Sequence, residues 1–243
     1  ISIVSSMGAT SMPARAKTLA SYFMFCPILR IASSSSTGFS IASALASRSV
    51  GRVVVSTDDS QIAAAAREHG AEVLDRPAAF AGDTTPEIVA WRHAIDSFRE
   101  LFRGPDAQPF ISLPATSPLR ASQDIDAAVE RFRTHPCDVL FGISPAHRNP
   151  HLNMVTVDSH GLIHIAIPGS AAVRRQDVPE MYDVTTCVYV GDAAYIQTCT
   201  RLMEGRVGHV VIPPERALAL DGQHVGAVQL AQLHVAQGPA NQR

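Results

Sequence analysis

Two kinds of segment alternate along the chain: short apolar runs, and longer segments with apolar residues at helical spacing. The short runs predict β-strands at 1–4, 52–56, 71–74, 109–113 and 138–144. The longer segments predict helices at 57–70, 84–102 and 121–135, the last one capped by Ser122. This alternation is typical of an α/β fold that has a mainly parallel sheet, right-handed crossovers and helices on both faces.

The pattern changes after about residue 149, where two strand-like runs flank a turn at Ser159–Gly161. They predict a small β excursion over about 145–182. Beyond it the sequence predicts a strand at 181–191, a helix at 192–205, a strand at 209–213 and a last helix at 221–236. We expect one domain over 1–243 that includes this excursion.

One segment, 32–49, is rich in serine and small residues. We interpret its first half as a surface loop and its second half as a weak helix. A linker or a membrane role is the less favoured alternative.

Composition narrows the class of protein. The 243 residues are 46% hydrophobic and 17% charged, as in a packed globular domain, and the formal net charge of −2 argues against a dedicated nucleic-acid or anionic-membrane binder. The four cysteines lack metal-ligand or disulfide spacing, which favours a reducing cytoplasm. The most apolar stretch, 19–32, contains Pro27 and Arg30 and is too short to span a membrane.

Candidate chemistry lies in the loops after the strands, because ligands bind at the carboxyl ends of the strands in open α/β sheets. The loop at 5–17 has one glycine, several hydroxyls and then Arg15 and Lys17, so it is either a phosphate loop or a plain connection. Asp58 and Asp59 follow a strand and favour a helix cap over a metal site.

Three further sites stay open between a functional and a structural role. Ser117 in "LPATSPLR" can bind a ligand or its own backbone. Arg174 and Arg175 in "VRRQD" suit a carboxylate or phosphate, although a solvated charge run is slightly favoured. Asp221 suits Mg²⁺, but a lone aspartate there is more often a cap.

The order of the motifs is more specific than any one of them. The chain carries, in sequence, "GRVVVSTDDSQIAAAAREHGAEVLDRPAAFAGD", "LPATSPLRASQDIDAAV", "HRNPHLNMV", "RRQDVPEMYDVTT" and "IPPERALALD". Together they resemble the acylneuraminate cytidylyltransferase family, the CMP-sugar-acid synthetases, over roughly residues 48–235.

The resemblance implies a Rossmann-like fold whose β excursion serves dimerisation, and a cytoplasmic homodimer. It implies a reaction in which CTP and a sialic-acid-like 2-keto sugar acid give a CMP-sugar and pyrophosphate, with Mg²⁺ as cofactor. From the net charge, we expect neither nucleic acid nor a membrane as a partner.

The resemblance also implies roles for individual residues. On the nucleotide side these are Gly8, Thr10, Arg76, Asp83 and Thr85, with Arg15 and Lys17 holding the phosphates. On the sugar side they are Ser117, Arg175, Thr185 and Tyr189. Asp221 matches the second aspartate of a D-x-D metal pair and is the expected metal ligand.

Departures from the family pattern cluster at the same sites. Two early basic positions of the phosphate loop become Ser6 and Ser11, and a later lysine becomes Cys26. The asparagine of an N-G step becomes Thr185, and the first aspartate of the metal pair becomes Ala219. Two alternatives therefore stay open: a catalytically impaired or non-catalytic homologue that binds nucleotides or partners, and a nucleotidylyltransferase for another substrate.

Overall fold

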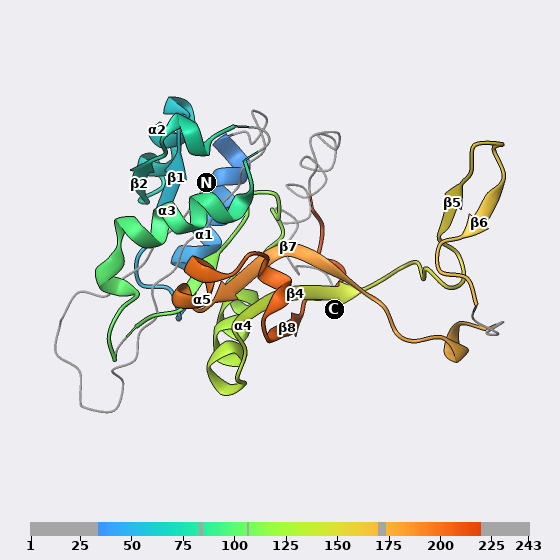
Figure 1. The fold of residues 1–243 in the computed structure, drawn as a ribbon. Helices are drawn as coiled ribbons and strands as arrows, with labels where there is room; N and C mark the ends of the chain where they lie inside the picture. Colours follow the sequence, from blue (N-terminus) through green and yellow to red (C-terminus); the bar gives the residue numbers. More distant parts are fainter. Residues whose placement is uncertain (1–33, 83–84, 106, 170–173, 220–243) are drawn as a thin grey trace, which may run out of the picture.

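The computed structural model describes residues 34–82, 85–105, 107–169 and 174–219 as an α/β body from which a long arm projects (Figure 1). Parallel strands β1 (Val54–Thr57) and β2 (Glu72–Asp75) form one sheet. A second sheet has the order β3-β7-β4-β8. Its strands are β3 (Phe110–Ser112), β4 (Val139–Pro145), β7 (Tyr182–Gly191) and β8 (Val207–Val211). The strand predicted at 1–4 and the helix predicted at 221–236 lie outside the described residues.

The predicted α/β class is confirmed, but β7 runs against its neighbours. It pairs antiparallel with β3 and with β4, whereas β4 and β8 are parallel. Strands β3, β4 and β8 therefore share one direction, and β7 is inserted between β3 and β4. The local pattern of apolar residues contains no information on strand direction, so the sequence analysis did not find this reversal.

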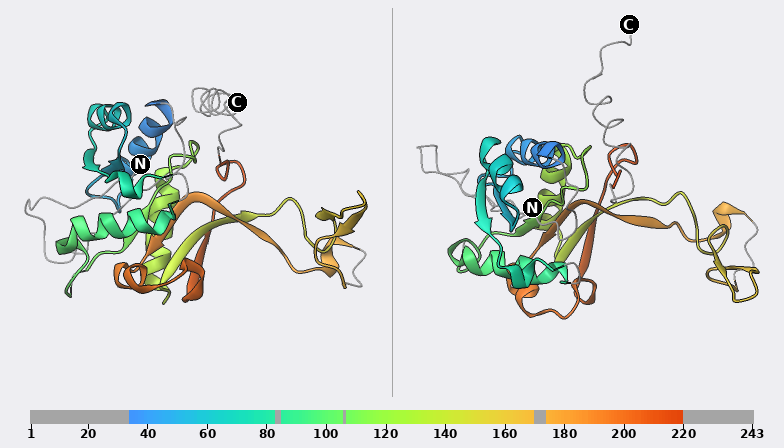
Figure 2. Two further views of the ribbon diagram at one scale, coloured as in Figure 1. Left: turned by 45° about the horizontal axis from the view of Figure 1, so that its top comes forward. Right: turned by 90° about the horizontal axis from the view of Figure 1, so that it is seen from above.

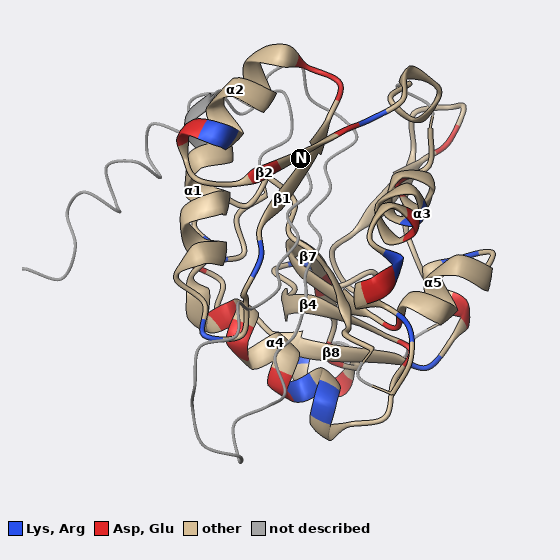
Figure 3. Ribbon diagram, turned by 90° about the vertical axis from the view of Figure 1, so that its left-hand side faces the viewer, with Lys and Arg blue, Asp and Glu red and all other residues tan. Residues whose placement is uncertain are grey.

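The sheets are covered on both faces, as predicted. Helices α1 (Ser34–Leu45), α2 (Ser60–Glu68) and α4 (Ser122–Thr134) cover one face, and α3 (Glu87–Ser97) and α5 (Ala193–Thr198) cover the other (Figures 1 and 3). Side chains alternate between two cores along the strands, because successive residues of a strand point to opposite faces. Val53, Val55 and Ile111 join the first core, whereas Val54 and Phe110 join the second.

The first half of the serine-rich segment is not the predicted loop, because helix α1 begins at Ser34, whereas the helix predicted for the second half is confirmed. Ile41 and Ala44 are completely buried in the first core, and Thr37 and Ser40 on the same helix are buried as well. Small side chains allow close packing here: a Cβ on Gly38 would lie 2.7 Å from the Nε2 atom of His69, the residue that follows α2. Tertiary packing thus outweighs the weak helix propensity of serine.

The two predicted helix caps have different outcomes. Asp59 caps α2 as expected, since its carboxylate accepts hydrogen bonds from the backbone N–H groups of Gln61 and Ile62. The prediction for α4 was one residue off: its cap position is Ala121, whose N–H donates to the carboxylate of Asp124 over 2.9 Å. Ser122 is the first residue of the helix instead.

Two predicted helices are shorter than expected. Helix α3 ends at Ser97, and a 3₁₀ turn, η2 (Arg99–Leu101), follows. Helix α5 ends at Thr198, before a second 3₁₀ turn, η4 (Leu202–Glu204). Arg92 of α3 terminates α5, because its guanidinium donates to the Ile196 carbonyl and to the Cys199 carbonyl.

The arm is the predicted excursion. The antiparallel pair β5 (Val155–Val157) and β6 (Ile163–Ile165) forms its tip, and a 3₁₀ turn, η3 (Arg175–Asp177), lies near it, far from the body (Figures 1 and 2). Apolar side chains on the arm are exposed: Val157 by 67% and Ile163 by 68%. Its tip therefore has almost no core of its own. Over the described stretches of the chain, no helix is long and apolar enough to span a membrane.

Truncation of a buried side chain should destabilise the protein much more than truncation of an exposed one. Leu140 in β4 is completely buried in the first core, so Leu140→Ala is expected to lower the unfolding free energy by about 2–5 kcal/mol. Leu45→Ala is the matched control, because Leu45 is 53% exposed and surface truncations usually cost within about 0.5 kcal/mol. Urea denaturation monitored by Trp91 fluorescence gives both values, and equal losses would contradict the proposed core.

Candidate functional site

A buried arginine organises the loop that follows β3. Arg120 is 5% exposed, and its guanidinium donates to the carbonyls of Pro114 and Cys187 and, over 3.1 Å, to the hydroxyl of Ser40 in α1. A longer bond of 3.4 Å reaches the Thr186 carbonyl. Burial lowers the pKa of Arg120, while Cys187 and Asp124 act in the opposite direction. One cation thus joins α1, the loop after β3 and strand β7.

Strand β7 has a bulge where Arg120 contacts it. Phe141 pairs with Tyr189, but Ile143 pairs with Val184, so β7 has three more residues than β4 between these pairs. The extra length is stabilised by Thr185, which is 4% exposed. Its hydroxyl donates to the Gly142 carbonyl over 3.1 Å and accepts from the Cys187 N–H.

The bulge brings a hydroxyl of β7 to the loop after β3. The Thr186 Oγ1 atom lies 2.8 Å from the Ser117 Oγ atom, and either can be the donor. Ser117 is buried, whereas Thr186 is partly exposed between two buried neighbours. Ser117 and Thr185, two predicted sugar-side residues, therefore lie in one hydrogen-bonded cluster around Arg120.

Arg76 directly follows β2, and hydrogen bonds to Ser56 hold its side chain in place. Its guanidinium donates to the Ser56 carbonyl over 2.5 Å and to the Ser56 hydroxyl over 3.3 Å, and it is 7% exposed. Helix α3 supplies His93 nearby, whose pKa is lowered by burial and by the charge of Arg76. The ring of Phe80 packs against His93 at 5.4 Å.

Helix α3 connects this region to β7. Its Trp91 packs against Tyr189 with ring centroids 5.8 Å apart, and Tyr189 also meets Phe141 at 5.2 Å. At the start of the helix, burial raises the pKa of Glu87 to about 7, although Trp91 acts in the opposite direction. Only burial makes this carboxyl unusual, so the local sequence around Glu87 predicts no more than its place in a helix.

A second buried contact anchors the segment after β8. Arg216 donates to both carboxylate oxygens of Asp124, with distances of 2.9 to 3.2 Å. Asp124 is 4% exposed at the start of α4 and also accepts from the Ala121 N–H. The ion pair therefore fixes the chain shortly before Ala219. This alanine aligns with the first aspartate of the expected D-x-D metal pair.

The structure brings some predicted residues together and separates others. Ser117, Thr185 and Tyr189 lie around β7. Arg76 lies near His93 of α3, the helix whose Trp91 packs against Tyr189. The N–H of Thr85 donates to the Gly82 carbonyl over 2.9 Å. Outside the described residues lie Gly8, Thr10, Arg15, Lys17, Asp83 and Asp221.

Arg175 is separate from all of these because it is on the arm. It is exposed, and its guanidinium donates to the His147 carbonyl over 3.1 Å. A cavity of about 630 Å³ on the arm is lined by both residues. Arg174 forms an exposed ion pair with Asp177, as a solvated charge run would.

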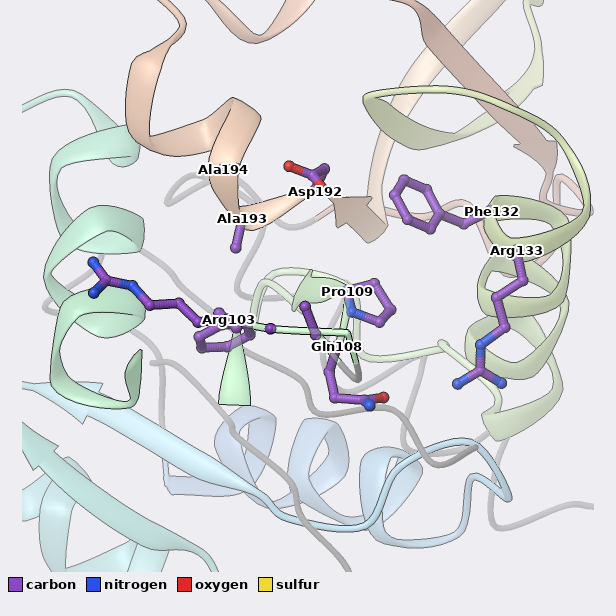
Figure 4. A pocket seen from close by; sticks show the side chains of 11 residues that line it. Arg103, Gln108, Pro109, Phe132, Arg133, Asp192, Ala193 and Ala194 are labelled. Atoms are coloured by element: carbon purple, nitrogen blue, oxygen red, sulfur yellow. The ribbon is translucent and has the colours of Figure 1, made fainter. Parts of the chain in front are cut away.

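A larger cavity of about 790 Å³ lies away from the predicted residues (Figure 4). Its lining comes from the segment before β3, the end of α4 and the start of α5. Arg103, Phe132 and Ala193 are among the side chains around it (Figure 4). Since β3 begins here, this cavity is at the opposite end of β3 from Arg120 and Ser117.

The described part of the chain contains no group of three or more His, Cys, Asp or Glu side chains able to hold a metal ion. Asp59, one of the two aspartates considered as ligands, is used as a helix cap. Its cap role is therefore confirmed.

No protein-family model matches the chain. The post-translational flagellin modification protein B of Campylobacter coli is 31% identical over 186 residues, which are 76% of this chain and 78% of that protein. The CMP-N,N'-diacetyllegionaminic acid synthase of Campylobacter jejuni is 29% identical over the same shares of the two chains.

A solved structure shares the fold. The CMP:2-keto-3-deoxy-manno-octonic acid synthetase in complex with CTP superimposes with a TM-score of 0.59 at 14% identity, over 83% of this chain and 88% of that chain. The predicted Rossmann-like fold is therefore confirmed.

Replacement of Arg120 should destabilise the site and the body together. Arg120→Met removes the charged donor of the buried carbonyls of Pro114 and Cys187, and each hydrogen bond to a charged group contributes about 1.5–3 kcal/mol. Arg120→Lys should recover only part of the loss, because an ammonium lacks the planar fork. Urea denaturation of both variants, with exposed Arg67→Met as the control, checks the order; an Arg120→Met protein as stable as the control would refute it.

Proposed function

The chain belongs to the acylneuraminate cytidylyltransferase family, and we propose that it transfers CMP from CTP to a sialic-acid-like 2-keto sugar acid and releases pyrophosphate. The similarity to a CMP-sugar-acid synthase over 186 residues carries this proposal. The structure supports it with a rigid cluster around Arg120 and Ser117 after β3, where open α/β sheets bind ligands.

In the proposed reaction, the anomeric hydroxyl oxygen of the sugar acid attacks the α-phosphorus of CTP. The new O–P bond forms as the bond to the β-phosphate oxygen breaks, pyrophosphate leaves, and the hydroxyl proton passes to solvent. Such transfers depend on positioning and on stabilisation of the developing charge. Rigid side chains at the ends of the strands are suited to both tasks.

On the nucleotide side, we assign Arg76 to the cytidine moiety, because Ser56 holds its guanidinium in one orientation. Thr85 and Asp83 would complete this loop. The loop at 5–17 would hold the triphosphate through Arg15 and Lys17. Gly8 would let the backbone approach the phosphates, and Thr10 would bind the nucleotide beside it.

On the sugar side, Ser117 and Thr185 act through the bulge of β7, since both hydroxyls are buried and internally bonded. Tyr189 would form an apolar wall together with Trp91. Arg175 would contact the sugar carboxylate. It lies far along the arm, so it would reach this site in a second copy of the chain.

Mg²⁺ is part of the proposal, with Asp221 as its protein ligand. Carboxylate oxygen is a preferred ligand of this ion, and when bound the ion would neutralise phosphate charge. Among the described residues there is no carboxylate cluster to complete such a site. The assignment therefore rests on Asp221 and the phosphates alone, and no step of the mechanism depends on it.

We propose a homodimer formed through the arm. Apolar residues are exposed along β5 and β6, and a hairpin with so little core is stabilised by a partner surface. We further propose a cytoplasmic location. It is supported by Cys137, Cys187 and Cys199, which are all free thiols.

A direct assay tests the activity. Wild-type protein with CTP, Mg²⁺ and N-acetylneuraminate or N,N'-diacetyllegionaminate should release pyrophosphate. Arg76→Lys should lower kcat/KM for CTP by roughly 10- to 100-fold, because an ammonium cannot replace the guanidinium fork. Arg67→Lys, an exposed change on α2, is the control and should leave kcat/KM unchanged.

The alternatives have distinct outcomes in the same experiment. Calorimetric binding of CTP without any pyrophosphate release would indicate an impaired homologue, and absence of CTP binding would indicate an interaction module. Faster turnover with UTP or GTP would indicate another substrate. Each of these results would overturn the proposed reaction.

Charged substitutions on the exposed apolar face of the arm test the proposed dimer. Val157→Glu combined with Ile163→Glu places two carboxylates on its exposed apolar face, so the mass from light scattering should fall from twice 25.9 kDa to 25.9 kDa. Met203→Glu, at a 56% exposed position on the body, should leave the dimer intact. A monomeric wild-type protein would refute the proposal.

A further inference from the structure

We infer that Thr186 is a further substrate-contact residue, whose hydroxyl binds a hydroxyl or amide group of the sugar acid. This inference deepens the proposed function and rests on it. In this inference, the partly exposed hydroxyl of Thr186 contacts the substrate at the bulge of β7, and the buried hydroxyl of Ser117 holds it in position.

Exposure distinguishes Thr186 within the bulge. Of the four β7 residues between Val184 and Tyr189, Thr185 is 4% exposed and Cys187 and Val188 are completely buried, whereas Thr186 is partly exposed. The Ser117 hydroxyl, 2.8 Å from that of Thr186, belongs to a residue that is 1% exposed. A ligand above the loop after β3 therefore meets Thr186 before it meets Ser117.

The backbone on both sides of the hydroxyl pair is fixed by the same cation. Arg120 donates to the Thr186 carbonyl over 3.4 Å, and also to the carbonyls of Cys187 and Pro114. Thr185 holds the bulge to Gly142. The Thr186 hydroxyl is thus preorganised, so a ligand that binds it loses little free energy in ordering the protein.

The chemistry of the pair determines which ligand group it suits. A hydroxyl has one proton and two lone pairs, so Thr186 keeps capacity to bind a ligand after bonding to Ser117. The nearby charge is not available, because every nitrogen of the Arg120 guanidinium donates within the protein. A neutral donor-acceptor group, such as a sugar hydroxyl or an N-acyl amide, therefore fits better than a carboxylate or a phosphate.

Three variants separate this contact from a structural effect. Thr186→Val keeps the shape and removes the hydroxyl, and Thr186→Ser restores the hydroxyl. The double variant Ser117→Ala/Thr186→Val removes both partners, so no buried hydroxyl is left unpaired and the fold should be kept. Thr134→Val is the control, because its hydroxyl contacts two carbonyls and the His135 ring at the exposed end of α4, far in the sequence from Thr186.

Initial rates of pyrophosphate release are measured while N-acetylneuraminate and CTP are varied separately. Thr186→Val and the double variant should raise KM for the sugar acid about three- to tenfold, as loss of one hydrogen bond predicts. KM for CTP should stay within about twofold of wild type. Thr186→Ser and Thr134→Val should behave as wild type for both substrates.

The failures are distinguishable. An active wild type whose KM for the sugar acid is unchanged in Thr186→Val and in the double variant would overturn this inference and leave the proposed function intact. A wild type that releases no pyrophosphate would overturn the proposed function. The inference would then be decided by calorimetry of N-acetylneuraminate with the CTP-loaded protein, where equal binding by wild type and Thr186→Val, or no binding at all, refutes it.

Discussion

The buried guanidinium of Arg120 is the interaction on which the rest of the described site depends. Its donors reach α1, the loop after β3 and the bulge of β7, three segments that are far apart in the sequence. A buried cation is tolerated only where hydrogen-bond acceptors replace its hydration. The three segments therefore adopt one mutual arrangement, and the hydroxyls of Ser117 and Thr186 are positioned by it.

Local features of this fold could be predicted from the sequence, whereas features that arise from long-range contacts could not. The cap at Asp59 and the strands of the body depend on a few neighbouring residues, and both agree with the structure. The start of α1 at Ser34 and the reversed direction of β7 depend on packing between distant segments. The same holds for the site: Arg120 was passed over because its acceptors include the side chain of Ser40, 80 positions earlier.

The described chemistry is divided between the body and the arm. Arg76, Ser117 and Tyr189 lie on the body, while Arg175 is held by His147 on the arm. The departures at Thr185 and Ala219 lie in the body, and Thr185 has acquired a structural role there.

Strand β7 belongs to two environments at once. Its first three residues, Tyr182 to Val184, are exposed beside the arm, and from Thr185 onward it runs through the interior of the body. A single strand thus continues from one environment into the other, and its bulge lies at the point of change. Variation among natural homologues should change character at Thr185: substitutions before it alter which surfaces the arm fits, and those after it alter whether the body folds.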